Sequence, residues 1–253
     1  MCLILLAYRS HPDYPLIVAA NRDEFLDRPT EPARFWKDHP DLLAGRDGVG
    51  GGTWMGITRR GRFAALTNFR NPSESLTHKK KSRGLLVRDY LITDLSPQNY
   101  LKRLSDQRTS YPGFNLLVGS HRELWYYSNQ TGAVCSVAPG IHGLSNALLD
   151  TPWPKVVKGK ARMAACLQKP DPSCLFELLA DEEPAPDEQL PDTGIGLERE
   201  RLLSPAFIRA PGYGTRSSTV LLVSARGEVN FIERSFAGEK TTEVRYRFFI
   251  EEE

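Results

Sequence analysis

The sequence of 253 residues lacks the features that mark several large classes of protein. It has no uninterrupted apolar stretch approaching the roughly 18 residues that a membrane-spanning helix needs. Its opening run, residues 1–7, is short, has no basic segment before it, and meets Tyr8 and Arg9 without a small-residue cleavage site. We therefore expect no signal peptide and no integral membrane segment, and we expect the protein to be cytoplasmic.

An excess of charge of one sign is also missing. Lysine and arginine number 33 against 31 acidic residues, a net charge of +2, so the chain lacks the basic field of a nucleic-acid-binding protein. We expect no nucleic-acid partner. The dense basic run at residues 78–83 is interpreted as a solvated loop that leads into a helix, although contact with phosphates or acidic lipid remains an alternative.

Cysteine and histidine are scarce. The four cysteines, Cys2, Cys135, Cys166 and Cys174, lack CxxC or paired zinc-ligand spacing, and the chain is too large to need a disulfide framework. We expect reduced thiols, which fits a cytosolic location. The five histidines show no HExxH or i, i+4 pairing, so we predict no catalytic metal.

Hydrophobic periodicity predicts one domain, residues 1–253, in which strand pairs at both ends of the chain enclose helical segments. Charge and proline predict loops at 28–45 and 181–193. This pattern suggests antiparallel sheets covered by helices, without excluding other α+β arrangements. The expected strands are 3–8, 16–20, 54–58, 63–67, 114–119, 123–127, 219–223, 228–236 and 244–248, and the expected helices lie within 84–108, 154–167 and 173–181.

Cys2 is the first candidate for chemistry. A starting methionine followed by a small side chain is commonly removed, which would leave a thiol and an α-amine on one residue. An α-amine has a pKa of about 7.7 to 8.0 and a cysteine thiol one of about 8.5, so the amine can accept the thiol proton while the thiolate attacks a carbonyl. The alternative is that Cys2 is a small apolar residue at the start of a buried strand.

The segment Asn21-Arg22-Asp23-Glu24 follows an apolar run and is placed at the end of a strand, where its side chains can enter a cleft. Asp23 can accept a hydrogen bond from the α-ammonium and hold it near the thiol. The alternative is a salt-bridged turn that caps the next segment.

Three further residues, Asn68, Asn146 and Arg216, are candidates because each has a polar group that acyl transfer can use. The amides of Asn68 and Asn146 can stabilise a developing oxyanion, and Arg216 can orient Cys2 and lower the pKa of its thiol. The alternatives are Asx turns for the two asparagines and a surface position for the arginine. Trp54 is interpreted as a core residue or a pocket wall.

These motifs occur together in one family. The chain resembles the NRDE family, the family of transport and Golgi organisation protein 2, from Cys2 to about Phe236. That family is similar to N-terminal-nucleophile hydrolases of the choloylglycine hydrolase and penicillin V acylase type, which implies a four-layer αββα sandwich with two mostly antiparallel sheets between helical layers. The motifs are Met1-Cys2, Ala19-Ala20-Asn21-Arg22-Asp23-Glu24-Phe25, Gly51-Gly52-Thr53-Trp54-Met55-Gly56, Leu66-Thr67-Asn68, Gly143-Leu144-Ser145-Asn146 and Pro211-Gly212-Tyr213-Gly214-Thr215-Arg216.

The resemblance also implies roles for the candidate residues. Cys2 matches the nucleophile, Asp23 the carboxylate beside the amine, Asn68 and Asn146 the oxyanion and positioning amides, and Arg216 the arginine near the thiol. The acylases have an arginine three residues before their aspartate. This chain has Ala20 there and places Arg22 next to Asp23.

Two classes of function follow from the resemblance. One is a hydrolase that needs no cofactor and cleaves a linear amide or thioester with an apolar acyl group. The other is a non-catalytic carrier of haem or of an acyl-lipid or acyl-CoA, whose ligand contacts Asn21, Arg22, Trp54 and Arg59, with arginines holding ligand carboxylates. An interaction scaffold with neither ligand nor chemistry is a third alternative, and the oligomeric state stays open.

Overall fold

The structure, a computed structural model, describes residues 2–72, 80–238 and 240–251. Within these residues the chain forms two antiparallel sheets, A and B, of seven strands each. In the order of pairing, sheet A contains β10 (Gly140–Leu144), β1 (Cys2–Tyr8), β2 (Leu16–Phe25), β12 (Tyr213–Val223), β13 (Glu228–Ala237) and β14 (Lys240–Phe249), with the short β11 (Arg209–Ala210) beside β12.

Sheet B is a simple meander in which each strand pairs with the next along the chain. Its strands are β3 (Thr30–Phe35), β4 (Leu42–Asp47), β5 (Met55–Thr58), β6 (Phe63–Asn68), β7 (Phe114–Gly119), β8 (Leu124–Ser128) and β9 (Val134–Ser136).

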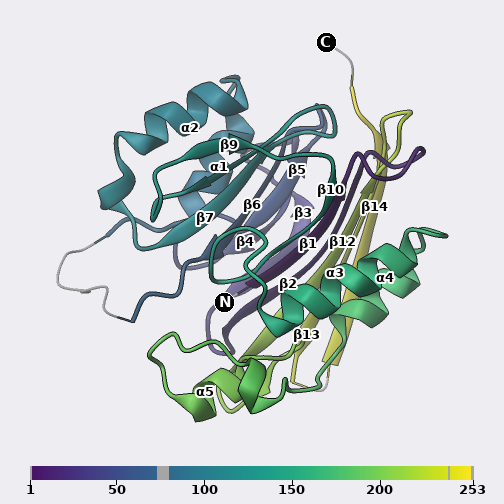
Figure 1. Cartoon of the computed structure of the whole chain (residues 1–253). Helices are drawn as coiled ribbons and strands as arrows, with labels where there is room; N and C mark the ends of the chain where they lie inside the picture. Colours follow the sequence, from purple (N-terminus) through teal and green to yellow (C-terminus); the bar gives the residue numbers. More distant parts are fainter. Residues whose placement is uncertain (1, 73–79, 239, 252–253) are drawn as a thin grey trace.

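The helices lie on the outer faces of the two sheets, as Figure 1 shows. Buried side chains of α1 and α2 pack against sheet B, and those of α3 and α4 pack against sheet A. A third cluster fills the space between the sheets. The structure therefore has the four layers αββα, which confirms the expected fold. The helices are α1 (Gly84–Ile92), α2 (Pro97–Ser105), α3 (Pro154–Cys166), α4 (Pro172–Leu179) and α5 (Leu197–Leu202), with single 3-10 turns at η1 (Arg108–Ser110) and η2 (Asp187–Gln189).

Strand β1 is apolar throughout because it is buried on both faces. Successive side chains of a strand point to opposite faces. Ile4 and Leu6 accordingly enter the core between the sheets, whereas Leu3 and Leu5 pack under α3 and α4. The same alternation continues on β2, and it decides which of its polar residues face the space between the sheets.

The segment 28–45 was expected to be a loop, and this expectation is wrong because it contains β3 and the start of β4. Only Ala33 of β3 is buried, so the exposed proline and charged residues hide the strand in the sequence. Strand β10 was not predicted either, although the segment 181–193 is irregular as expected apart from η2.

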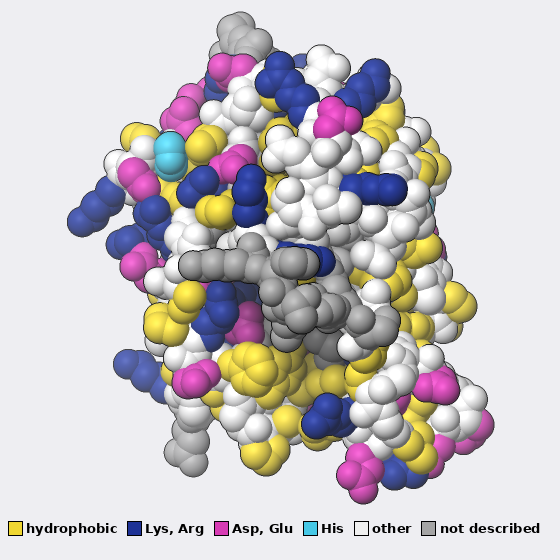
Figure 2. Space-filling model, turned by 90° about the vertical axis from the view of Figure 1, so that its left-hand side faces the viewer, with side chains coloured by type: hydrophobic (Ala, Val, Ile, Leu, Met, Phe, Trp, Pro, Cys, Tyr) yellow, Lys and Arg dark blue, Asp and Glu magenta, His cyan; other side chains and the backbone are white. Residues whose placement is uncertain are grey.

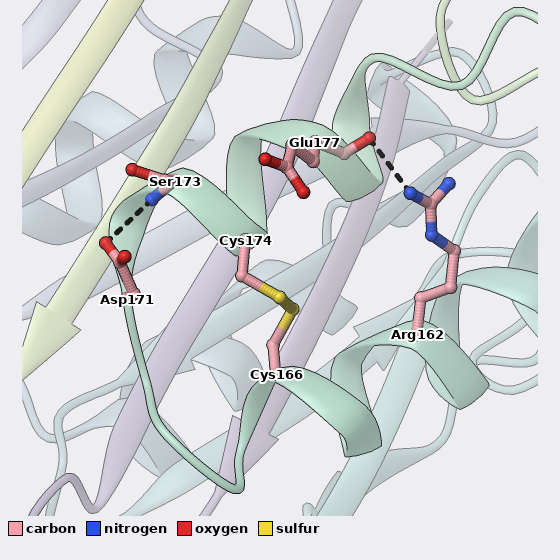
Figure 3. The surroundings of a disulfide bond; sticks show 6 residues. All are labelled: Arg162, Cys166, Asp171, Ser173, Cys174 and Glu177. Carbon is pink, nitrogen blue, oxygen red and sulfur yellow. Dashed lines mark hydrogen bonds between the residues drawn. A yellow bond between two sulfur atoms is a disulfide. The ribbon is translucent and has the colours of Figure 1, made fainter.

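A disulfide joins Cys166, the last residue of α3, to Cys174 in α4 (Figure 3). The expectation of four reduced thiols is therefore wrong for this pair, and it no longer supports a cytosolic location. The two cysteines meet because α3 and α4 pack side by side, which no spacing rule reveals. Asp171 caps α4 by accepting a hydrogen bond from the Ser173 amide at 3.0 Å, which helps to place Cys174.

In the part of the chain that the structure describes, no helix is both long enough and apolar enough to cross a membrane.

Candidate active site

A cleft of about 810 Å³ opens where the first residues of β1 meet the ends of β2, β5, β6 and β12. On the face shown in Figure 2, basic and acidic side chains are mixed and a hydrophobic area lies below the centre, so no single charge dominates. The predicted residues that line the cleft are Cys2, Arg22, Asp23, Trp54, Asn68 and Arg216.

Cys2 begins β1 and is only 7 % exposed. It lies directly opposite Arg22 of β2, and both side chains belong to the face between the sheets. Burial raises the pKa of the Cys2 thiol, while the positive charge of Arg22 and the backbone N–H of Asp23 act in the opposite direction. The thiol therefore needs a base before it can act as a nucleophile.

Asp23 follows Arg22 on β2 and is only 1 % exposed. Burial raises the pKa of its carboxyl group. The hydroxyl of Thr215 donates to its Oδ1 at 2.7 Å, and this bond favours the carboxylate. Tyr213 donates to the backbone oxygen of Asp23 at 3.2 Å, so β12 fixes both the backbone and the side chain.

Lys155, at the start of α3, is a residue of the site that sequence reasoning missed. Its side chain is buried, and its Nζ donates to the carbonyl oxygens of Leu203 at 2.7 Å and Pro205 at 3.2 Å. Burial lowers the pKa of Lys155 to about 8, although the charge of Asp23 opposes the change. Among the described residues no carboxylate oxygen lies within 4.0 Å of this ammonium. Lys155 is therefore a buried cation near Asp23 and Cys2 whose ammonium group donates hydrogen bonds to backbone carbonyls.

Arg216 occupies a β-bulge. Thr215 is opposite Asp23 and Ser217 is opposite Arg22, so Arg216 is the extra residue of β12. Its guanidinium donates to the backbone oxygens of Phe25 at 2.8 Å and Arg28 at 3.1 Å. Arg216 therefore lines the cleft and holds the turn after β2. The sequence placed it just before a strand, whereas the structure places it inside β12.

Asn68 and Asn146 lie together, but only Asn68 lines the cleft. The side-chain amide of Asn146 donates to the backbone oxygen of Asn68 at 2.8 Å, and the backbone N–H of Arg70 donates to the Asn146 carbonyl at 2.8 Å. The Asn146 amide is thus occupied in holding the end of β6. The side chain of Asn68 has no hydrogen-bond partner among the described residues and remains available to a ligand.

Two of the proposed ligand contacts, Asn21 and Arg59, do not reach the cleft. Asn21 points to the opposite face of sheet A, where its amide donates to the carbonyls of Leu179 and Ala206 and accepts from Ser218. Arg59 follows β5 at the end remote from Trp54 and stacks on the Phe35 ring at 4.0 Å. Neither residue is therefore placed to contact a ligand in the cleft. Alternation turns Asn21 to the outer face of sheet A, and the length of β5 separates Arg59 from the cleft.

Part of the basic run lines the same cleft. Lys80, Lys81 and Arg83 are among its lining residues, whereas His78 and Lys79 lie outside the described residues. Arg83 donates to the Gly113 carbonyl at 3.0 Å as the chain enters α1. The expectation of a loop leading into a helix is consistent with this described part.

Comparison with known proteins places the chain in a family. Residues 1–238 match the family model described as transport and Golgi organisation 2. A Bos taurus protein called transport and Golgi organization protein 2 homolog is 40% identical over 270 residues, covering 96% of this chain and 95% of the relative. The chain belongs to the transport and Golgi organisation 2 family.

Solved structures show which fold this family member has. A Caenorhabditis elegans N-acylethanolamine-hydrolyzing acid amidase ortholog superimposes with a TM-score of 0.54 at 12% identity, over 87% of this chain and 92% of the other. The C2A mutant of a conjugated bile acid hydrolase from Clostridium perfringens gives 0.53 at 8% identity, over 96% and 92% of the two chains. The family member therefore has the fold of the N-terminal-nucleophile hydrolases.

No metal site accompanies this fold in the part of the chain that is described. Within residues 2–72, 80–238 and 240–251 there is no group of three or more His, Cys, Asp or Glu residues arranged to hold a metal ion. The polar groups that the candidate residues place at the site are a thiol, a carboxylate, amides and guanidinium groups.

Proposed function

We propose that this protein is an N-terminal-cysteine hydrolase that cleaves a linear amide or thioester with an apolar acyl group. The observation that carries the proposal is the position of Cys2, whose thiol begins β1 on the inner face, opposite Arg22, at a cleft large enough for a substrate. Trp54 and Leu66 supply apolar contacts in that cleft. The fold supports the same class of reaction.

The proposed reaction needs the α-amine of Cys2, and so removal of Met1. The amine takes the thiol proton, and the sulfur forms a bond to the acyl carbonyl carbon. The bond from that carbon to the leaving nitrogen or sulfur then breaks as the leaving group takes the proton from the α-ammonium. Water attacks the resulting thioester with the amine as base, which releases a carboxylic acid and restores the thiol.

Other residues of the site assist these steps. Asn68 donates its amide to the carbonyl oxygen as negative charge develops there, and Asn146 holds Asn68 in place through the bond of 2.8 Å. Asp23, fixed by Thr215, accepts a hydrogen bond from the α-ammonium. Arg22 stabilises the thiolate by its charge.

The test is hydrolysis of dodecanoyl amides and thioesters by untagged protein whose intact mass shows loss of Met1. We expect Cys2→Ala to lose all turnover while its circular dichroism and melting temperature stay close to those of the wild type. Cys135→Ala, at the exposed free cysteine, is the matched control and should retain full turnover. Equal turnover by Cys2→Ala and the wild type, or retention of Met1 in an active protein, would contradict the mechanism.

A second candidate function is carriage of haem or an acyl-lipid without catalysis. The cleft volume of about 810 Å³ favours it as well, because it lies within the range of about 300 to 1,000 Å³ typical of small-molecule pockets. Among the described lining residues none is histidine or methionine, so Cys2 and Tyr213 are the groups that can ligate haem iron.

Haem titration separates the two candidates. A carrier gives a saturable Soret shift in a protein that hydrolyses none of the acyl probes, and Cys2→Ala or Tyr213→Phe changes the spectrum if that residue ligates the iron. A Soret shift that persists unchanged in both variants would assign the binding to another surface. Absence of saturable binding of both haem and acyl-CoA rules out the carrier.

A further inference from the structure

Four strand pairings extend a single row of side chains from Cys2 across the inner face of sheet A. Cys2 is opposite Arg22, Arg22 is opposite Ser217, Ser217 is opposite Ser235, and Ser235 is opposite Thr242. Residues that are directly opposite share one face of a sheet. The last three residues, Ser217, Ser235 and Thr242, are called the hydroxyl row.

The hydroxyl row belongs to the same cleft as Cys2. All three of its residues line that cleft, together with Cys2 and Arg22. Ser217 is only 7 % exposed, and its hydroxyl has no hydrogen-bond partner among the described residues. The Ser217 hydroxyl is therefore available to a ligand in the cleft, while the Ser235 hydroxyl also bonds the buried Glu233 carboxylate and keeps its lone pairs for a ligand.

The β-bulge at Arg216 makes this arrangement. On β12, Leu221 and Val223 belong to the core between the sheets, and alternation from them places Ser217 on the same inner face. Without the bulge, regular pairing of the same residues would put Arg216 opposite Asp23 and turn Thr215 inward. The bulge instead lets Thr215 bond Asp23 on the outer face while Ser217 faces the cleft.

The part of the cleft beside the hydroxyl row is called the arm. Its opposite wall comes from β3 and β4 of sheet B. Gly45 lies there, and a side chain at this position would begin 3.1 Å from the Glu31 carbonyl and 3.7 Å from the Glu233 carboxylate. Glu233 accepts a hydrogen bond from the Ala33 amide at 2.7 Å, which ties sheet A to sheet B at the base of the arm. Glu233 therefore joins the two walls of the arm, and Gly45 leaves space beside this contact.

Most charges along this wall are already paired. Arg28 binds Asp47 at 2.7 Å, and Arg34 binds Glu31 at 2.5 Å. The arm thus offers hydroxyl groups and, on the sheet B wall, paired charges, beside the buried carboxylate of Glu233. Such a surface favours a polar group without a large net charge.

We propose that the hydroxyl row is the subsite for the leaving group, and that this group is an extended chain bearing amide or hydroxyl groups. The inference rests on the proposed hydrolase function. Neighbouring strands lie about 4.7 to 4.9 Å apart, so Ser217 is about 10 Å and Thr242 about 19 Å from β1. A leaving group of that length can bond all three hydroxyls while its scissile carbonyl lies at Cys2.

The experiment compares two dodecanoyl amides, one with methylamine as leaving group and one with the peptide amide Gly-Ser-Gly-Ser-NH₂. We expect the wild type to prefer the peptide probe in kcat/KM by about tenfold, since two modest hydrogen bonds account for that factor. Ser217→Ala combined with Ser235→Ala should abolish this preference, mainly through KM, and leave the methylamide rate unchanged. Thr241→Val, an exposed position next to the row on β14, is the matched control and should keep the preference.

The outcomes distinguish the subsite from the hydrolase function. Equal loss of both probes in the double variant, or an unchanged preference, overturns the subsite. If the wild type hydrolyses neither probe, the proposed function fails, and the subsite is then tested by calorimetric binding of the peptide probe. In that case about tenfold weaker binding by the double variant supports the subsite, and equal binding by both proteins overturns it.

Discussion

At the scale of single residues, Lys155 is the most unusual group in the site. Among the described residues, two carbonyl oxygens accept hydrogen bonds from this buried ammonium, and such an arrangement is costly because carbonyl dipoles compensate less than a carboxylate does. Its charge acts on Asp23 and favours the carboxylate there. The protein therefore keeps a positive charge near the Asp23 carboxylate at the expense of stability.

Lys155 should give the protein a distinctive dependence of stability on pH. Burial lowers its pKa in the folded state to about 8 from an ordinary value of 10.5, so the unfolded chain binds more protons between these values. The free energy of unfolding should therefore rise with pH across this window, by about 3 kcal/mol. Urea unfolding of the wild type and Lys155→Met at pH 7 to 10 measures the difference.

The expected result is that the wild type gains stability relative to Lys155→Met as the pH increases. Lys102→Met removes an exposed lysine of α2 and should follow the wild type at every pH. If the wild type and Lys155→Met change in parallel, Lys155 does not bear a depressed pKa.

Single residues were predictable where the chemistry and the strand pattern agree. Cys2, Asp23, Asn68 and Arg216 all line one cleft, as their positions at the ends of apolar runs suggested. The sequence did not indicate that Lys155 belongs to the site, because a lysine after the proline that opens a helix ordinarily lies in solvent.

Alternation explains the residues that were misplaced or overlooked. Asn21 was grouped with its neighbours although a strand turns successive side chains to opposite faces, so it shares a face with Asp23 rather than with Arg22. The same rule, applied backward from Leu221, finds Ser217 from the sequence once the strand is known to extend that far.

At the scale of elements, the disulfide between α3 and α4 closes a loop with a sequence separation of 8. Removing it frees the unfolded chain, which lowers the free energy of unfolding by about 2 to 3 kcal/mol for a loop of this size. We expect Cys166→Ala combined with Cys174→Ala to unfold at lower urea concentration. Excess reductant should lower the wild type to the same level and leave the double variant unaffected.

Turnover is the control for the disulfide prediction, because the two cysteines lie on the outer side of sheet A, away from the cleft. We expect the double variant to hydrolyse the acyl probes at the wild-type rate below its unfolding transition. Equal urea midpoints for the oxidised wild type and the double variant would show that the bond adds no stability.

Elements with one buried and one solvated face were harder to predict than fully buried strands. β1 is apolar throughout and β12 ends in the apolar run Val220–Val223, so both are evident in the sequence. β3 carries proline and charged residues on an exposed face, and its pairing with β4 and its tie to Glu233 determine its structure instead. Tertiary contacts of this kind have no counterpart in local sequence.

At the scale of the whole molecule, the four layers correspond to three separate buried clusters, one in each space between layers. Alternating strands and amphipathic helices predict such layers, and the family resemblance specified their order. The location of the cleft could not be derived in this way. It depends on which residues of the two sheets come to lie together, which is a property of the assembled sandwich.

The site also draws on the full length of the chain. Cys2 comes from the first strand, Asn68 from the middle of sheet B, and Thr242 from the last strand. The family match ends at residue 238, and β14 begins at Lys240. Thr242, at the end of the hydroxyl row, therefore lies beyond the part of the chain that the family model covers.

The bulge at Arg216 shifts the alternation of side chains between the two halves of β12. Thr215 before the bulge shares the outer face with Asp23, and Ser217 after it shares the inner face with Arg22, although two residues so spaced in a regular strand would share a face. An exchange of one amino acid for another leaves that offset intact. Deletion of Arg216 would leave every other residue of β12 opposite its present partner on β2, whereas deletion of a residue elsewhere in the paired strand would shift the pairing on one side and turn those side chains to the other face.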